Sequence, residues 1–176
     1  MTAILSGKKV AMIIASNGYR DEEFEEPRKI LSSNGAQITV ASSSLKEAKG
    51  TLGGKVKPDT LINDIRTEDF DCIIFVGGAG SSEYWNSPVA HEIAKSAYTS
   101  GKIISAICIA PVTLANAGIL NGKKATVFPS EVGRLRNRGA TCTGRGVEVD
   151  GNIITADGPS SAKNFANTIV NKLSSK

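Results

Sequence analysis

The chain has 176 residues, of which 40% are hydrophobic and 22% are charged, and it carries a formal net charge of +4. This balance excludes an intrinsically disordered chain, which combines low hydrophobicity with high net charge. No apolar stretch approaches the roughly 18 residues of a membrane span. The first ten residues also lack the charged start and long apolar core of a secretory signal. We therefore expect a single domain over residues 1–176, located in the cytoplasm and without membrane contacts.

Three cysteines and one histidine limit metal and disulfide chemistry. Cys72, Cys108 and Cys142 are odd in number and show no CxxC spacing, which argues against a disulfide framework and a structural zinc site. Because His91 is the only histidine, a His-rich metal site is excluded as well. We expect neither a metal nor another cofactor.

Charged residues gather in two segments. Acidic residues crowd positions 21–26, and the basic cluster consists of Arg134, Arg136, Arg138 and Arg145. Nucleic-acid-binding proteins usually combine a basic stripe with exposed aromatic side chains, and this arginine cluster contains none. It is interpreted as a solvated helix face or a subunit contact, and no nucleic-acid partner is expected.

Short apolar runs alternate with helical patterns along the chain. Strands are predicted at residues 8–15, 36–41, 71–76 and 102–107. Helices are predicted at residues 20–33, 88–101 and from 159 or 160 onward. The apolar runs are continuous and do not alternate with polar residues, which is typical of a parallel sheet covered by helices on both faces. The predicted fold is α/β, a doubly wound and mostly parallel sheet.

Two segments interrupt this alternation. Residues 43–60 are rich in glycine, lysine and threonine and predict a hairpin or an exposed excursion. Near the C-terminus, Asp150-Gly151 separates two strand-like runs, and this dipeptide predicts a small hairpin whose two turn positions both have positive φ. The last helix is expected to bury one stripe, formed by Ala162, Phe165, Ala166, Ile169, Val170 and Leu173.

The segment K-I-I-S-A-I-C-I-A-P contains the strongest chemical signal. A buried strand runs into Cys108, and a helix is expected to start two or three residues later, with Pro111 near its first turn. Ligand sites of open α/β sheets lie along the carboxyl ends of the strands. A helix N-terminus beside the sulfur would lower the pKa of Cys108 and make it a nucleophile or a redox target. The alternative is a buried cysteine that fills space, which is the interpretation preferred for Cys72 and Cys142.

Four motifs, in order along the chain, resemble those of the ThiJ/PfpI family. They are Y-R-D-E-E-F-E-E-P, the strand that ends in Gly77-Gly78, the segment A-I-C-I-A-P, and the tail I-T-A-D-G-P-S-S-A-K-N-F-A. This family includes intracellular proteases and the parkinsonism-associated protein, within the class I glutamine-amidotransferase-like fold. The resemblance covers nearly the whole chain and implies the flavodoxin-like arrangement of that fold.

The resemblance also implies roles for individual residues. Cys108 would be the nucleophile, and the backbone N–H groups of Gly78 and Ile109 would form an oxyanion hole. Glu23 would project from the first helix toward the sulfur, and the two groups would share one proton. From the residues alone, the preferred interpretation of Glu23 is a solvated acidic face shared with Glu22, Glu25 and Glu26. Members of the family are usually dimers or hexamers, so a homodimer or hexamer is expected.

The sequence departs from the family at the histidine positions. Protease-like members have a histidine directly after the cysteine, where this chain has Ile109, and others have one at the position of Phe128. His91 lies on the predicted helix 88–101, opposite its apolar residues, and is expected to face solvent. Glu83 resembles an acidic residue that family proteases borrow across an interface, but no histidine is present for it to orient.

Two functions remain open at this point. The first is a cysteine-dependent hydrolase or an enzyme with glyoxalase- or deglycase-like activity on small carbonyl or acyl substrates, since a general acid for a leaving amine is absent. The second is a redox sensor or stress-protective protein in which Cys108 is oxidised without turnover. A phosphate loop at residues 77–80 is weakly indicated, because neither G-x-G-x-x-G nor G-K-[ST] occurs.

Overall fold

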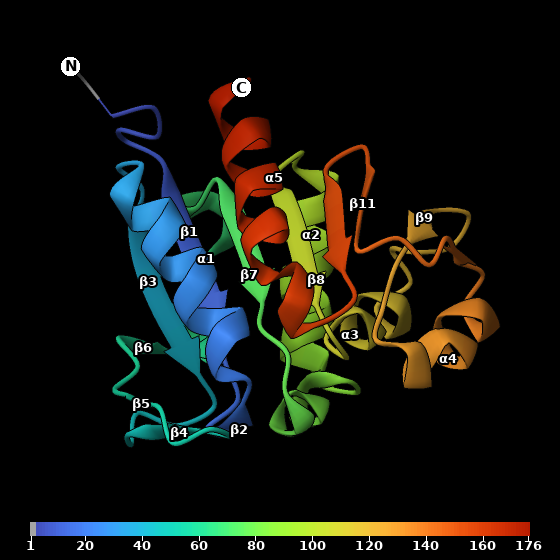
Figure 1. Ribbon diagram of the computed structural model, residues 1–176, viewed down its shortest axis with the longest axis horizontal. Coiled ribbons are helices and arrows are strands. Elements are labelled where there is room, and N and C mark those ends of the chain that lie inside the picture. The colour runs from blue at the N-terminus through green and yellow to red at the C-terminus, as the bar shows by residue number, and fades with distance from the viewer. Residues whose placement is uncertain (1–2) are drawn as a thin grey trace.

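The computed structural model describes residues 3–176 and is built around a seven-stranded sheet of order β11-β12-β8-β7-β1-β3-β6 (Figure 1). Its strands are β1 (Lys9–Ile13), β3 (Gln37–Ser42), β6 (Thr60–Leu61), β7 (Cys72–Phe75), β8 (Ile103–Ile107), β11 (Val147–Asp150) and β12 (Ile153–Ala156). Neighbouring strands are parallel, except that β11 runs antiparallel to β12. The predicted doubly wound, mostly parallel sheet is confirmed.

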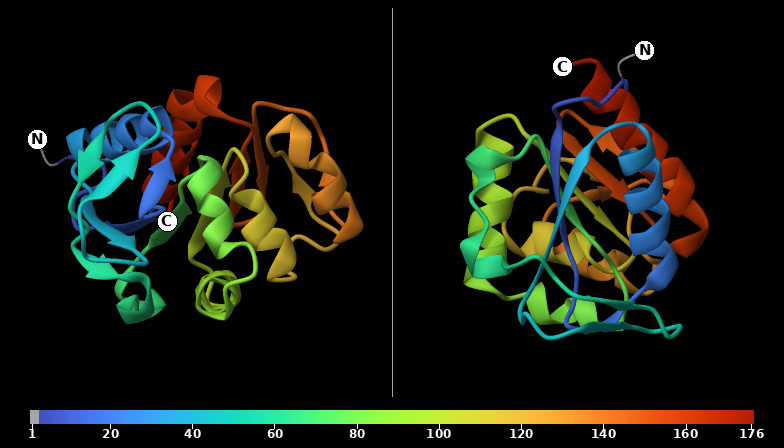
Figure 2. Two further views of the ribbon diagram at one scale, coloured as in Figure 1. Left: turned by 90° about the horizontal axis from the view of Figure 1, so that it is seen from below. Right: turned by 90° about the vertical axis from the view of Figure 1, so that its left-hand side faces the viewer.

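Helices cover both faces of the sheet, as the view along its edge in Figure 2 shows. One layer is formed by α1 (Asp21–Ser33) and α5 (Ala162–Ser174), which pack against each other. The other layer contains α2 (Pro88–Thr99) and α3 (Pro111–Asn116), and α4 (Val132–Asn137) packs against α3. Ser87 caps α2, because its side chain accepts a hydrogen bond from the backbone N–H of Ala90.

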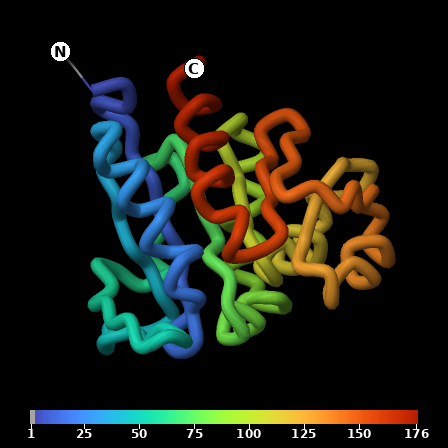
Figure 3. Tube along the Cα trace, in the orientation of Figure 1, coloured from blue at the N-terminus to red at the C-terminus, as the bar shows by residue number. Residues whose placement is uncertain are grey.

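The sheet separates two hydrophobic clusters, one beneath each helical layer. The predicted stripe of α5 lies in the cluster that α5 shares with α1, and all six of its residues are buried. The tube in Figure 3 shows α5 crossing the sheet beside α1, with the C-terminal end near the N-terminal end of the chain. The three- and four-residue spacing of apolar positions therefore located the buried face of this helix correctly.

Two small sheets extend the fold. The first contains β2 (Asn17–Tyr19), β4 (Ala48–Gly50) and β5 (Lys55–Val56), and its β4–β5 pair is the hairpin expected within residues 43–60. The second pairs β9 (Lys124–Ala125) with β10 (Thr141–Cys142). Asp21 at the start of α1 fixes the β4–β5 loop, because its carboxylate accepts hydrogen bonds of 2.7 Å from the backbone N–H groups of Leu52 and Gly54.

The structure corrects two local predictions. The β11–β12 hairpin forms, but Asp150 pairs with Ile153, so the turn consists of Gly151 and Asn152. Only Gly151 has positive φ there, at 61°, as in turns that place glycine first.

His91 does not simply face solvent. It is half-buried, and its Nε2 lies 2.8 Å from the backbone carbonyl of Trp85.

Within residues 3–176, no helix is both long enough and apolar enough to cross a membrane.

Replacing Phe165 with alanine is expected to lower the free energy of unfolding by about 3–5 kcal/mol, because this ring is fully buried between α5 and the sheet and its loss leaves a cavity. Urea denaturation measures the change. The matched control is Asn167→Ala, an exposed position on the same helix, which is expected to change stability by less than about 0.5 kcal/mol. Equal effects of the two substitutions would contradict the assigned core face.

Candidate active site

Cys108 occupies a strained turn between β8 and α3. Its φ of 65° makes it the only residue other than glycine with positive φ among residues 3–176. Such a conformation costs on the order of 1–3 kcal/mol and persists only where neighbouring structure holds it. Two backbone hydrogen bonds do so here: Cys108 N–H donates to Ala156 at 2.9 Å, and Phe128 N–H donates to the Cys108 carbonyl at 2.8 Å. The predicted turn is confirmed, with α3 beginning at Pro111.

The glycine pair that follows β7 allows three chain segments to meet at the sulfur. A Cβ atom at Gly77 would lie 2.5 Å from Cys108 Cβ and 2.9 Å from Glu23 Oε2, so any larger residue would separate these two side chains. Gly78 has a φ of 101°, and a Cβ there would overlap the backbone of Gly18 and Arg20. Both positions therefore require glycine for steric reasons.

Glu23 is fully buried on α1 and faces Cys108. Neither of its carboxyl oxygens has a hydrogen-bond partner within the described chain, and the neighbouring Cys108 side chain acts on its pKa in the opposite direction to burial. The alternative of a solvated acidic face is wrong for this residue, although Glu25 on the same helix is exposed. A buried carboxyl without hydrogen-bond partners is costly, and titratable groups perturbed in this way cluster at functional sites.

Two backbone N–H groups converge on the Cys108 sulfur. They belong to Gly78, in the glycine pair beyond the end of β7, and to Ile109, directly after the cysteine, and each acts to lower the pKa of Cys108. The structure thus brings together all four residues that the sequence nominated: Glu23, Gly78, Cys108 and Ile109. Donors placed in this way are suited to hold negative charge on the sulfur or on an oxygen bound next to it.

The charge states of the pair differ from the sequence-based expectation. Burial raises the pKa of Glu23 from 4.5 to about 8, so the carboxyl is protonated at neutral pH. Burial is the main effect that raises the pKa of Cys108 to about 12, and the charge of Glu23 is the second. The two N–H groups oppose this rise. The predicted lowering of the Cys108 pKa is therefore wrong, because desolvation exceeds the influence of the short helix α3. One shared proton is expected only above pH 8.

The sulfur opens into a pocket of about 310 Å³. Its lining residues are Arg20, Thr51, Gly78, Ala79, Cys108, Ile109, Phe128, Ser130 and Pro159. Arg20 is held by a bidentate ion pair with Glu22 at 2.8 and 3.1 Å, and Thr51 comes from the β4–β5 loop that Asp21 fixes.

Sequence reasoning missed Arg20, Thr51, Ser130 and Pro159. The only signal for Arg20 was its position three residues before Glu23.

The remaining candidates lie outside this pocket. His91 does not line it, and exposed Glu83 accepts a hydrogen bond from Ser16 N–H. Cys72 is fully buried, and burial raises its pKa to about 12, whereas Cys142 is half-buried near the Val132 carbonyl. Residues 3–176 contain no group of three or more His, Cys, Asp or Glu side chains that could hold a metal ion.

Comparison with known proteins shows where this geometry occurs. The model of the DJ-1/PfpI family matches residues 8–172. The chain belongs to the DJ-1/PfpI family. A solved ThiJ/PfpI domain protein from Brachyspira murdochii is 34% identical, with a TM-score of 0.94 over 97% of this chain and 99% of that one. An uncharacterized protein from Methanocaldococcus jannaschii is 44% identical over 92% of this chain and 80% of its own length.

Other relatives carry more specific names. Protein dj-1beta from Drosophila melanogaster is 33% identical over 96% of this chain and 91% of its own length. A glutathione-independent glyoxalase from Caenorhabditis elegans is 32% identical over 82% of this DJ-1/PfpI chain and 77% of its own. The deglycase PfpI from Pyrococcus furiosus is 29% identical over 84% of this chain and 89% of its own.

The substitution Glu23→Gln is expected to lower the pKa of Cys108, because it removes the negative charge that disfavours the thiolate. The pH dependence of iodoacetamide alkylation, measured at Cys108 by mass spectrometry, tests this. Glu25→Gln, an exposed position on the same helix, is the control and is expected to leave the profile unchanged. An unchanged Cys108 profile in the Glu23 variant would contradict the coupling.

The same substitution is expected to flatten the pH dependence of stability. Because the folded-state pKa of Glu23 is raised from 4.5 to about 8, the wild-type carboxyl contributes fully below pH 4.5, and this contribution is lost as the pH rises through about 8. Urea unfolding measures the free energy of unfolding across this pH range. In the wild type and in Glu25→Gln it is expected to decline by an amount on the order of a few kcal/mol, and in Glu23→Gln by less. Identical declines in all three proteins would refute the assignment.

Proposed function

We propose that this protein is a cysteine-dependent enzyme that converts small reactive carbonyl compounds, with glyoxalase- or deglycase-like activity. The observation that carries the proposal is the buried carboxyl of Glu23 beside Cys108, which lines a 310 Å³ pocket that no histidine lines. The names of the glyoxalase and deglycase relatives support the same class of substrate. A pocket of this size suits a small molecule.

The chemistry begins with addition of Cys108 to an aldehyde carbon. A carbon–sulfur bond forms, the π bond of the carbonyl breaks, and the thiol hydrogen passes to the former carbonyl oxygen, next to the N–H groups of Gly78 and Ile109. For a 2-oxoaldehyde, the ionised form of Glu23, roughly a tenth of the population at pH 7 for a pKa of about 8, then removes the proton from the former aldehyde carbon and returns it to the neighbouring carbon. The hydroxyl proton on the former aldehyde carbon passes to the oxygen of the neighbouring carbon, which leaves a thioester. A carboxyl with a pKa of about 8 is suited to both transfers near neutral pH.

Hydrolysis of the resulting thioester by water releases a 2-hydroxy acid and regenerates the thiol. In the overall reaction one water is added, the aldehyde carbon is oxidised and the adjacent ketone carbon is reduced, so no external oxidant is needed. Peptide hydrolysis is less well supported, because it requires a general acid for the leaving amine. His91 is occupied by the Trp85 carbonyl and does not line the pocket.

Cys108→Ser is expected to lower kcat/KM toward methylglyoxal by at least about 10³-fold, because a serine hydroxyl without a strong base is a far weaker nucleophile. Formation of the 2-hydroxy acid is followed by NMR. Cys142→Ser, which alters a half-buried cysteine outside the pocket, is expected to retain activity, and circular dichroism verifies folding of both variants. Turnover that survives in the Cys108 variant would exclude the mechanism.

A second function, redox sensing without turnover, is favoured by the position of Cys108 in a solvent-connected pocket beside backbone donors and a carboxyl group. Two molecules of hydrogen peroxide would oxidise the thiol to a sulfinic acid and be reduced to water. Mass spectrometry after mild peroxide treatment is expected to find the added oxygens on Cys108. Equal oxidation of Cys72 and Cys142 would count against this function.

A further inference from the structure

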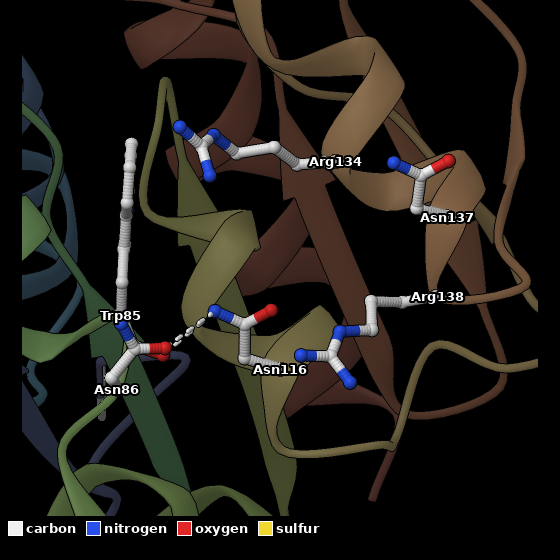
Figure 4. A pocket seen from close by; sticks show the side chains of 6 residues that line it. All are labelled: Trp85, Asn86, Asn116, Arg134, Asn137 and Arg138. Carbon is white, nitrogen blue, oxygen red and sulfur yellow. Dashed lines mark hydrogen bonds between the residues drawn. The ribbon is translucent and has the colours of Figure 1, made fainter.

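A second cavity, of about 380 Å³, lies between α4 and the turn that precedes α2 (Figure 4). Its lining residues are Trp85, Asn86, Asn116, Arg134, Asn137 and Arg138. It shares no lining residue with the Cys108 pocket. Five of the six side chains are amides or guanidinium groups, and none is a carboxylate. The composition of this cavity therefore differs from that of an ordinary hydrophobic pocket.

Hydrogen bonds preorganise one wall of the cavity. Asn116 donates from Nδ2 to the Trp85 carbonyl at 2.9 Å and to Asn86 Oδ1 at 3.2 Å, and His91 contacts the same carbonyl. The Trp85 indole N–H donates to the Ile109 carbonyl at 3.2 Å. These contacts hold the indole and both amides in place before any ligand arrives, which reduces the entropic cost of binding.

The opposite wall supplies positive charge from α4. Arg134 stacks on Trp85, with its guanidinium carbon 4.7 Å from the ring centroid, and its Nε is paired with Glu131 at 2.8 Å. Arg138 forms no ion pair within residues 3–176, and Figure 4 shows its guanidinium extending toward Asn116. The fork of an arginine side chain matches the oxygen atoms of a phosphate or carboxylate group.

The size and polarity of the cavity define the ligand further. A volume of 380 Å³ corresponds to roughly a dozen water molecules at about 30 Å³ each, which is more than a single phosphate ion requires. Three asparagine amides provide donors and acceptors of the kind that hydroxyl groups need. No aliphatic side chain lines the cavity to favour an apolar ligand.

We propose that this cavity, which we call the α4 pocket, is a binding site for a hydroxyl-bearing anion of the sugar-phosphate class. Arg138 and Arg134 hold the phosphate group, and the amides of Asn86, Asn116 and Asn137 hold the hydroxyl groups. The site is separate from the chemistry at Cys108, so its occupation is independent of the function proposed above. The four clustered arginines noted in the sequence thus contribute two side chains to a small-molecule site.

Trp85 is the only tryptophan in the chain, so its fluorescence and its indole N–H resonance report on the wall that it forms in the α4 pocket. Titration with ribose 5-phosphate is expected to produce a saturable change in both signals, inorganic phosphate a weaker one, and ribose none. Arg138→Gln is expected to weaken binding by about 10-fold or more, because it removes a charged partner of the phosphate. Cys108→Ser is expected to bind as tightly as the wild type.

Arg136→Gln is the matched control, since Arg136 lies exposed on the same helix but outside the cavity. It is expected to retain the affinity of the wild type. Equal weakening by both arginine substitutions would indicate diffuse electrostatic attraction and overturn the proposal. The absence of a saturable signal would also overturn the proposal. A signal that changes with protein concentration and not with ribose 5-phosphate would overturn it as well, because it would indicate a contact between copies of the chain.

Discussion

The close approach of Glu23 and Cys108 across Gly77 is the contact on which the rest of the site depends. It requires α1 to bury a carboxyl group against the end of β8, and it requires glycine where β7 ends. The cost is considerable: a desolvated acid and a cysteine with positive φ. Packing of α1 against α5 and two backbone hydrogen bonds at Cys108 offset that cost. The fold thereby holds together a buried acid and a thiol that a flexible chain would separate.

Desolvation also decides what this pair can do. It keeps both Glu23 and Cys108 neutral at pH 7, so the cysteine is not a freely exposed thiolate. A neutral carboxyl and a neutral thiol are suited to a reaction in which proton transfer accompanies addition of the sulfur to the substrate. Such an addition requires a substrate with an electrophilic carbon. Under the function proposed above, this accounts for the choice of small carbonyl compounds as substrates in a pocket whose lining contains no histidine. It is also consistent with the glyoxalase and deglycase relatives in the DJ-1/PfpI family.

Trp85 connects the two cavities of the molecule. Its indole N–H contacts the carbonyl of Ile109, one of the residues beside the reactive sulfur, while its ring forms a wall of the α4 pocket. Its carbonyl is held by Asn116 and His91. The single histidine thus makes a structural contact at this junction from a half-buried position.

The sequence by itself determined the order and type of the main elements, because continuous apolar runs, glycines and Pro88 or Pro111 are local signals of strands, turns and helix starts. It also nominated Cys108, since a cysteine between such a strand and such a helix lies at the sheet edge where open α/β folds bind their ligands. Only the tertiary structure decided that Glu23 is buried, that Arg20 and Thr51 line the pocket, and that the Cys108 pKa is raised. These properties depend on which distant segments cover a side chain, and burial of this kind leaves no periodic trace in the sequence. The hairpin at Asp150 shows the same limit locally, since strand pairing moved its turn by one residue.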